Sequence, residues 1–214
     1  MSSESSMSIP EWDWKTGGAR PHTFDILQGG LTRICPALSG NERLLDIGCG
    51  NAAFTEIFAE RGCAVVGIDA SPSGIEHARD RLPDGRFECM EICDDMLGAL
   101  GEEPFDLVLS TEVVEHLYDP RQWARACYNS LKPGGAMMCS TPYHGYLKNL
   151  LISLTDGWDR HLQPYKDGGH IKFWSFRTLG ALLEDVGFTI ERRTGAGRVP
   201  WLWNSMVVLA RKPS

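Results

Sequence analysis

A glycine-rich turn between two apolar runs carries the clearest chemical signal of this 214-residue chain. The first run leads into Asp46, and Gly48 and Gly50 follow at once; the second run ends in Asp69, nineteen residues after Gly50. Glycine has no Cβ, so backbone built from it approaches a ligand closely and adopts positive φ angles. A carboxylate at this distance lies where the sugar diol of a nucleotide is usually held. The pattern predicts a nucleotide-like ligand.

A second set of side chains has the composition of a metal site. Glu112, Glu115 and His116 follow a later apolar run, and positions i, i+3 and i+4 of a helical turn share one face. The spacing predicts that these three side chains project together, and a cation would relieve the repulsion of the two carboxylates. His170 is the best candidate for a further ligand. Carboxylates with imidazoles suit Mg²⁺, Mn²⁺ or Zn²⁺.

Other interpretations of this set stay open. Glu115 and His116 could form a hydrogen-bonded pair that only supports the end of a strand. His116 or His170 could act as a general base without any metal. His144 and His161 are rivals for either role.

The elements that must position these residues alternate between strand and helix. The alternation predicts an α/β fold, a Rossmann-like doubly wound and mostly parallel seven-stranded sheet with a C-terminal antiparallel hairpin. Strands are predicted at 43–47, 64–68, 86–89, 105–110, 136–140, 188–193 and 206–211, and helices at 53–61, 72–81, 120–131 and 177–186. Ligands of such sheets bind outside the carboxyl ends of the strands. The acids at or just after those ends are Asp46, Asp69, Glu91 and Glu112.

The domain organisation predicted is one domain with an N-terminal cover. Residues 1–40 form a tail and cover that contain Trp12 and Trp14, and residues 41–214 form the domain itself. The segment at about 143–174 is long for a loop and rich in aromatic residues, which predicts a lid with its own helix. Trp201 and Trp203 could join that lid. A lid lined by aromatic side chains suits an aromatic or lipidic acceptor.

The composition of the chain limits which classes of partner and which cellular location are expected. The formal charge is −7 with no dense run of Lys or Arg, so nucleic acid is an unlikely partner. The seven cysteines include no C-x-x-C pair, which favours reduced thiols and a cytoplasmic location. No apolar run reaches membrane-spanning length, although peripheral contact of the lid with a membrane stays open.

The glycine-rich turn resembles the first motif of the class I S-adenosylmethionine (SAM)-dependent methyltransferases, acid-x-Gly-x-Gly-x-Gly. Ala52 stands at the third glycine, and the dinucleotide fingerprint G-x-G-x-x-G does not fit. An acid before the turn would repel a pyrophosphate but attract the ammonium of SAM. Asp94 rivals Glu91 for the adenine. The cofactor-binding residues that the resemblance implies are Asp46, Gly48, Gly50, Asp69, Ala70, Glu91, Ile92, Thr111 and Glu112.

A closer resemblance covers roughly residues 42–190. The chain resembles the ubiquinone-pathway O-methyltransferases, which act on polyprenyl catechols and related phenols. The resemblance rests on the E-x-x-E-H-x-x-D-P segment at 112–120, the Lys-Pro-Gly-Gly run at 132–135 and a late histidine before Lys172-Phe173. The two Glu and two His also resemble the small-RNA 3′-terminal 2′-O-methyltransferases, where such residues bind a divalent ion. In both families the acceptor hydroxyl has another hydroxyl beside it.

These observations predict a SAM-dependent O-methyltransferase for a small phenolic, catecholic or diol-bearing acceptor. Catalysis would rest on His116 and His170, and a divalent ion would be held by Glu112, Glu115, His116 and His170. One alternative is a metal-free sugar or secondary-metabolite N- or O-methyltransferase that uses a histidine base. Another is a SAM-binding regulatory domain without catalysis.

Overall fold

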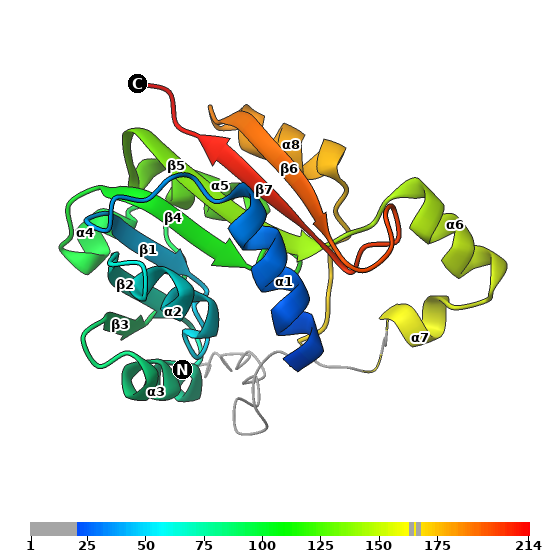
Figure 1. Ribbon diagram of the computed structural model, residues 1–214, viewed down its shortest axis with the longest axis horizontal. Coiled ribbons are helices and arrows are strands. Elements are labelled where there is room, and N and C mark those ends of the chain that lie inside the picture. The colour runs from blue at the N-terminus through cyan, green and yellow to red at the C-terminus, as the bar shows by residue number, and fades with distance from the viewer. Residues whose placement is uncertain (1–20, 163–164, 166–167) are drawn as a thin grey trace, which may run out of the picture.

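The computed structural model describes residues 21–162, 165 and 168–214, and its centre is one seven-stranded sheet (Figure 1). The strand order is β3-β2-β1-β4-β5-β7-β6, in which β7 runs antiparallel to both of its neighbours. The strands are β1 (Arg43–Ile47), β2 (Ala64–Asp69), β3 (Arg86–Cys89), β4 (Phe105–Thr111), β5 (Leu131–Pro142), β6 (Thr189–Ala196) and β7 (Ser205–Arg211). The predicted doubly wound sheet with its closing antiparallel hairpin is confirmed.

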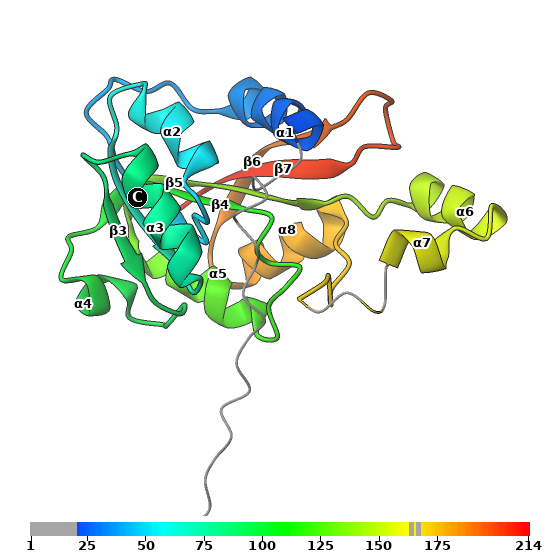
Figure 2. The same cartoon turned by 90° about the horizontal axis from the view of Figure 1, so that it is seen from below.

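Helices cover both faces of the sheet and enclose two separate cores (Figure 2). One face carries α1 (Pro21–Ile34), α2 (Ala53–Ala59) and α3 (Pro72–Arg81), and the other carries α4 (Met96–Leu100), α5 (Pro120–Asn129) and α8 (Phe176–Asp185). Successive strand side chains point to opposite faces, so Leu44 packs in the first core and Leu45 in the second. The strands are therefore apolar on both faces.

Several helices begin where the sequence predicts because a polar side chain caps them. The Ser71 hydroxyl accepts a hydrogen bond from the Gly74 N–H at the start of α3, and the Asp119 carboxylate accepts from the N–H groups of Arg121 and Gln122 at the start of α5. A proline opens each of these two helices, where its missing N–H costs nothing. The caps fix the helices that follow two strand ends.

Two stretches differ from the sequence prediction. The short helix α4 was not predicted; Asp95 caps it and Gly101, with a φ of 64°, ends it. The strand expected from Ala136 begins at Leu131, so the Lys-Pro-Gly-Gly run lies inside β5 rather than before it. The pairing register of β4 with β5 shifts in this stretch, because the run adds residues that have no partner in β4.

The lid contains two helices, α6 (Tyr146–Leu154) and α7 (Trp158–Leu162), which project beyond the end of β5 (Figures 1 and 2). No residue of either helix is buried. The chain then returns to the sheet, where the His144 N–H donates to the carbonyl of Trp174. Trp203 packs against Tyr143 at 5.2 Å between ring centroids, whereas Trp201 is largely exposed. Trp12 and Trp14 lie outside the described residues.

The predicted cover over the sheet includes α1, which packs on β6 and β7. All seven cysteines are free thiols. Among the described helices, none combines the length and the apolar character that crossing a membrane requires.

Candidate active site

The glycine-rich turn lies between the ends of β1 and β2 and needs glycine at Gly48. The N–H groups of Gly48 and Cys49 both donate to the carbonyl of Ile68 at the end of β2, at 2.8 and 2.9 Å. Gly48 has a φ of 83°, and a Cβ there would lie 2.3 Å from Cγ2 of Val113. The backbone of the turn is thus pressed against the loop that follows β4.

Ala52 adopts the left-handed conformation at the third glycine position of the motif. Its φ is 59°, and it forms the N-cap of α2. The substitution of Ala for Gly therefore adds backbone strain as well as a methyl group, which the sequence alone does not show. Two contacts hold the turn: the Ala52 N–H donates to Cys49 O at 2.8 Å, and Nε of Arg81 donates to Asn51 O at 2.9 Å.

Asp69 ends β2 and connects the turn to the next helix. Its Oδ2 accepts from the Gly50 N–H and its Oδ1 from the Ser71 N–H, both at 2.8 Å. Burial raises the pKa of this carboxyl, and the two backbone hydrogen bonds oppose that rise. The carboxylate is held in one orientation at the sheet edge where the sequence predicts the ribose of SAM.

Asp46 is fully buried beneath the same turn and has one unsatisfied oxygen. Its Oδ2 accepts from the Thr55 hydroxyl at 2.6 Å, but Oδ1 has no hydrogen-bond partner among the described residues. Burial raises its pKa to about 7. A buried carboxylate without a compensating charge is unfavourable, and an ammonium group would supply that charge. Asp46 therefore fits the methionine end of SAM.

On the adenine side, the two rival acids differ in their surroundings. Asp94 forms an ion pair with Arg125, at 2.9 Å between Oδ1 and Nε. Glu91 is exposed just after β3, and Ile92 packs partly against the core. Met90, directly before Glu91, donates its N–H to the carbonyl of Asp69, so this loop starts beside the residue predicted to hold the ribose. Within the part of the chain that the structure describes, Glu91 is thus the rival that forms no ion pair with a basic side chain.

Glu112 is held by hydroxyl groups of the sheet and does not belong to the group that Glu115 and His116 form. Its φ is 55°, so no helical turn begins at Glu112, and the helical geometry from which the spacing predicts a shared face is absent. Its carboxylate points instead between two strands, accepting from the hydroxyls of Ser140 on β5 at 2.8 Å and Ser205 on β7 at 3.1 Å. Thr111, the last residue of β4, is paired with Ser140 in the sheet.

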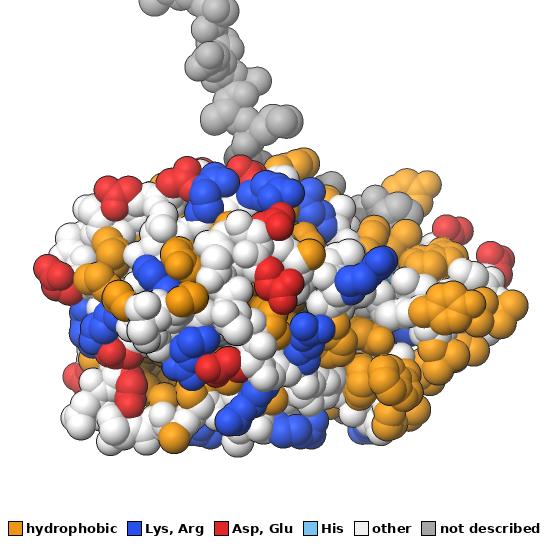
Figure 3. All heavy atoms as spheres, turned by 90° about the horizontal axis from the view of Figure 1, so that it is seen from above, with side chains coloured by type: hydrophobic (Ala, Val, Ile, Leu, Met, Phe, Trp, Pro, Cys, Tyr) orange, Lys and Arg blue, Asp and Glu red, His pale blue; other side chains and the backbone are white. Residues whose placement is uncertain are grey.

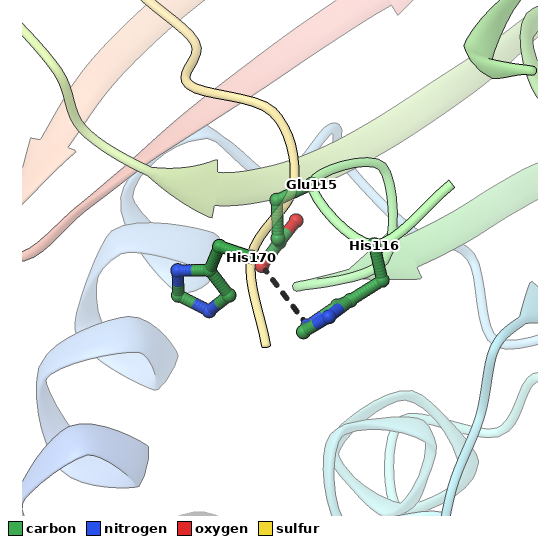
Figure 4. Close-up of side chains that lie close together, drawn as sticks. All are labelled: Glu115, His116 and His170. Carbon is green, nitrogen blue, oxygen red and sulfur yellow. Dashed lines mark ion pairs between the residues drawn. The ribbon is translucent and has the colours of Figure 1, made fainter. Parts of the chain in front are cut away.

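Glu115, His116 and His170 come together, as Figure 4 shows. One possible ligand atom of each lies within 4.8 Å of the others. Glu115 is buried; its Oε2 accepts from the Thr141 hydroxyl at 3.0 Å, while Oε1 has no hydrogen-bond partner among the described residues and lies 3.9 Å from Nε2 of His116. The two imidazole rings are 5.0 Å apart between centroids. Three of the four predicted metal ligands therefore form one group.

The backbone explains how residues so far apart in sequence meet. The carbonyl of Glu115 accepts from the N–H groups of Ile171 and Lys172, at 2.9 and 3.1 Å, which fixes the returning lid segment just after His170. Nδ1 of His116 lies 3.3 Å from the carbonyl of Gly169, in the same segment. A hydrogen bond from Nδ1 to that carbonyl leaves Nε2 as the ligand atom, an arrangement common in metal sites.

The electrostatics of this group favour a bound cation. Burial raises the pKa of Glu115 well above its ordinary value, and the neighbouring Glu112 carboxylate raises it further. The pKa of Glu112 is also raised by burial, although the two serine hydroxyls oppose the rise. A cation at Glu115 would remove the penalty for ionising both carboxyls.

The rival histidines lie in the lid. The rings of His144 and His161 are 5.3 Å apart, and Nδ1 of His144 lies 3.3 Å from Oδ1 of Asn149. Burial lowers the pKa of His144 to about 4, which makes it a poor base near neutral pH. Neither belongs to the group around Glu115.

Sequence reasoning missed the residues that support the site. Thr141, Ser140 and Ser205 hold the two carboxylates, yet nothing in their local sequence marks them. Their role follows from the pairing of β5 with β7, which places Ser205 opposite Pro142. That pairing is not visible before the sheet is assembled.

Comparison with known proteins decides the family. The family described as "Methyltransferase domain" matches residues 20–192. Curated proteins named "Ubiquinone biosynthesis O-methyltransferase" are similar over much of the chain: the protein of Cereibacter sphaeroides is 46% identical over 166 residues, 76% of this chain and 67% of that protein. The protein of Pseudomonas putida is 32% identical over 182 residues, 84% of this chain and 78% of that protein. The chain is a SAM-dependent methyltransferase of this O-methyltransferase family.

Solved structures agree on the fold of the methyltransferase. A putative SAM-dependent methyltransferase from Listeria monocytogenes has a TM-score of 0.67 at 17% identity, with 89% of this chain and 99% of that chain covered. One from Mesorhizobium loti has a TM-score of 0.67 at 21% identity, covering 88% of this chain and 99% of that chain. SAM is the methyl donor of the enzyme, in agreement with the cofactor that the glycine-rich turn predicts.

Proposed function

We propose that this methyltransferase transfers the methyl group of SAM to a phenolic hydroxyl of a catechol-type acceptor, assisted by a divalent ion. The relatives named for ubiquinone biosynthesis support the phenolic acceptor. The observation that carries the proposal is the group of Glu115, His116 and His170, in which a buried carboxylate oxygen finds no hydrogen-bond partner in the described part of the chain. An unsatisfied buried carboxylate oxygen beside two imidazoles suits a ligand set for a cation.

The residues fit such an ion by their chemistry. Glu115 would contribute Oε1, and its second oxygen is already occupied by Thr141. His116 would contribute Nε2, since its Nδ1 faces the Gly169 carbonyl, and His170 would contribute a ring nitrogen. Glu112 could supply a fourth ligand only by giving up a hydrogen bond from Ser140 or Ser205.

The chemistry needs an acceptor oxygen without its proton, because a phenol attacks a sulfonium methyl well only as the phenolate. A divalent ion lowers the pKa of a coordinated hydroxyl and orients it. Binding of both hydroxyls of a catechol determines which oxygen faces the methyl group, which is a proximity effect. Asp69, Asp46 and the glycine-rich turn, which packs against Val113 of the loop that follows β4, would hold the donor. The sulfonium itself needs no further activation.

The competing mechanism uses a histidine as general base. His170 is exposed, so it can pass a proton from the acceptor to water. The two mechanisms make different predictions for chelator treatment. Activity that survives removal of metal by EDTA would favour the base mechanism.

The test uses SAM with catechol, and detects the methyl ether by mass spectrometry. After exhaustive dialysis against EDTA, we expect turnover to fall at least tenfold and to return with Mg²⁺, Mn²⁺ or Zn²⁺. Metal content is measured separately by elemental analysis of wild type, Glu115→Gln and Glu112→Gln. We expect the Glu115 variant to lose the metal and the Glu112 variant to bind it more weakly. Binding of S-adenosylhomocysteine with no turnover of any phenol or sugar would contradict catalysis and favour a regulatory role.

The exposed apolar side chains of the lid fit a second part of the proposal, contact with a membrane surface. In Figure 3, hydrophobic side chains gather over the lobe at the right, the side from which α6 projects. The large exposed apolar side chains of α6 are Tyr146, Leu147, Leu150, Leu151 and Leu154. Apolar patches of this kind mark sites of protein or membrane interaction. An acceptor with a long hydrocarbon tail would be presented from such a surface.

Flotation with phosphatidylcholine vesicles tests this part separately. We expect wild type to float with the vesicles and Leu150→Glu/Leu154→Glu to remain in solution. Tyr118→Glu adds charge at an exposed aromatic side chain outside α6 and serves as the control. If all three proteins float equally, or none does, α6 is not the contact.

A further inference from the structure

Both polar ends of the peptide group between Asn51 and Ala52 are held by hydrogen bonds. Nε of Arg81, the last residue of α3, donates to the Asn51 carbonyl at 2.9 Å, and the Ala52 N–H donates to Cys49 O at 2.8 Å. The orientation of this planar group sets the φ angle of Ala52, because φ is the rotation about the bond from its N to its Cα. The two hydrogen bonds therefore fix Ala52 in the left-handed conformation, with a φ of 59°.

The left-handed conformation is unfavourable for alanine but not for glycine. A residue with a Cβ disfavours it by a factor of about five or more, whereas glycine adopts positive and negative φ angles about equally. Ala52 stands where the methyltransferase motif usually has its third glycine. The turn of this chain therefore needs a support that the glycine form of the motif does not need, and the hydrogen bond from Arg81 is such a support.

Arg81 also reaches the helix that follows the turn. Its Nη1 lies 2.9 Å from Oε2 of Glu56 on α2, and the two side chains are 37% and 35% exposed. Ion pairs with this exposure contribute little to stability by themselves. A guanidinium can use several N–H donors at once, so the Glu56 contact holds the planar group in place while Nε bonds to Asn51. The competing explanation is that Arg81 only joins α3 to α2.

We propose that Arg81 is a positioning residue for the methyl donor, which holds the turn in its SAM-binding shape and compensates for alanine at position 52. The inference rests on the donor site predicted at this turn, and not on the acceptor or the divalent ion proposed above. Without the Arg81 contact, Ala52 would leave the left-handed conformation in most molecules. The affinity for a ligand falls with the fraction of molecules that keep the binding conformation.

Titration calorimetry with S-adenosylhomocysteine tests this compensation on wild type, Arg81→Met, Ala52→Gly and the double variant. We expect Arg81→Met to weaken binding about fivefold or more, because the left-handed alanine then lacks its support. In the Ala52→Gly background, the same replacement should weaken binding by less than about twofold, because glycine keeps the conformation in about half of the molecules. Ala52→Gly alone should bind like wild type, since Arg81 still holds the peptide group.

Two matched variants control for the loss of a charged side chain near the turn. Arg79→Met removes an arginine from the same helix whose hydrogen bonds, at 2.6 and 3.1 Å, go to the Phe87 carbonyl and not to the turn. Glu56→Gln removes the ion pair of Arg81 but keeps the contact with Asn51. Both variants should bind S-adenosylhomocysteine as tightly as wild type.

Three outcomes would count against the inference or its basis. Wild-type affinity in Arg81→Met would overturn the inference. Equal losses with alanine and with glycine at position 52 would also overturn it, because they would show that Arg81 only joins the two helices. Failure of the donor site itself is recognised separately, since Asp69→Ala would then bind S-adenosylhomocysteine as tightly as wild type.

Discussion

Oδ2 of Asp69 accepts a hydrogen bond from the backbone N–H of Gly50, at 2.8 Å, and thereby joins the end of β2 to the turn that follows β1. The other oxygen accepts from Ser71 N–H at the start of α3. One carboxylate thus orients both the turn and the helix that border the predicted donor site. Each oxygen keeps a further lone pair for a ribose hydroxyl.

Replacing Asp69 with Ala should weaken binding of S-adenosylhomocysteine by about tenfold or more. The reason is the loss of charge-assisted hydrogen bonds, worth roughly 1.5–3 kcal/mol. Isothermal titration calorimetry measures the affinity directly. The control is Asp80→Ala, which removes an exposed carboxylate from α3 and should leave the affinity for S-adenosylhomocysteine unchanged. Unchanged affinity in the Asp69 variant would refute the ribose assignment.

Titration of Asp46 should make cofactor binding weaker and the unliganded protein more stable as the pH falls. Its pKa is raised to about 7 in the folded protein, against an ordinary value of 3.8. Ionisation therefore costs free energy in the folded protein above pH 7, and this cost disappears as the pH falls from 7 towards 4. The unliganded enzyme should gain stability from this group over that window. Binding of an ammonium-bearing cofactor should weaken over the same window, by up to about tenfold per pH unit.

Calorimetry and thermal unfolding at pH 8, 6.5 and 5.5 measure both effects of Asp46. Asp46→Asn removes one titrating group, so its cofactor affinity should be weak at pH 8 and should fall less steeply than that of wild type as the pH is lowered. The carboxyl of Asp69, whose pKa is also raised, titrates in both proteins and is accounted for by the comparison. If wild type and variant had the same pH profile, Asp46 would not hold the ammonium.

The fold was predictable because it depends on local signals. Ser71 before Pro72 and Asp119 before Pro120 each mark a helix start after a strand, and the apolar runs define the parallel strands. The same signals place Asp46 and Asp69 at the edge where ligands bind. The short helix α4 escaped prediction because five residues are too few to show a helical period.

The arrangement of the predicted metal ligands was only partly predictable from the sequence. The i, i+3, i+4 spacing of Glu112, Glu115 and His116 assumes a helix, but Glu112 takes a positive φ and pairs with hydroxyls of β5 and β7. The meeting of Glu115 with His170 rests on backbone hydrogen bonds across the lid. Spacing along the chain cannot reveal either contact, because both depend on tertiary structure.

His170→Ala should leave cofactor affinity unchanged and reduce turnover of catechol at least a hundredfold, which is within the range for lost acid–base or metal assistance. His170 lies with Glu115 and His116. It is not among the residues predicted to hold the donor. Calorimetry with S-adenosylhomocysteine and single-turnover kinetics separate the two effects. His77→Ala, on α3, is the control. Full activity of the His170 variant would remove this residue from the site under either mechanism.

Gly48→Ala should destabilise the protein for two reasons that a second substitution separates. The left-handed conformation costs roughly 1–2 kcal/mol for a residue with a Cβ, and the added Cβ would lie 2.3 Å from Cγ2 of Val113. Val113→Ala removes the second penalty but not the first. We therefore expect the double variant to be more stable than the sum of the single variants allows, since residues in contact show coupling of about 0.5–3 kcal/mol. Urea unfolding of wild type, the two single variants and the double variant measures the coupling. Strictly additive losses in the free energy of unfolding would show that the turn is not packed against the loop that follows β4.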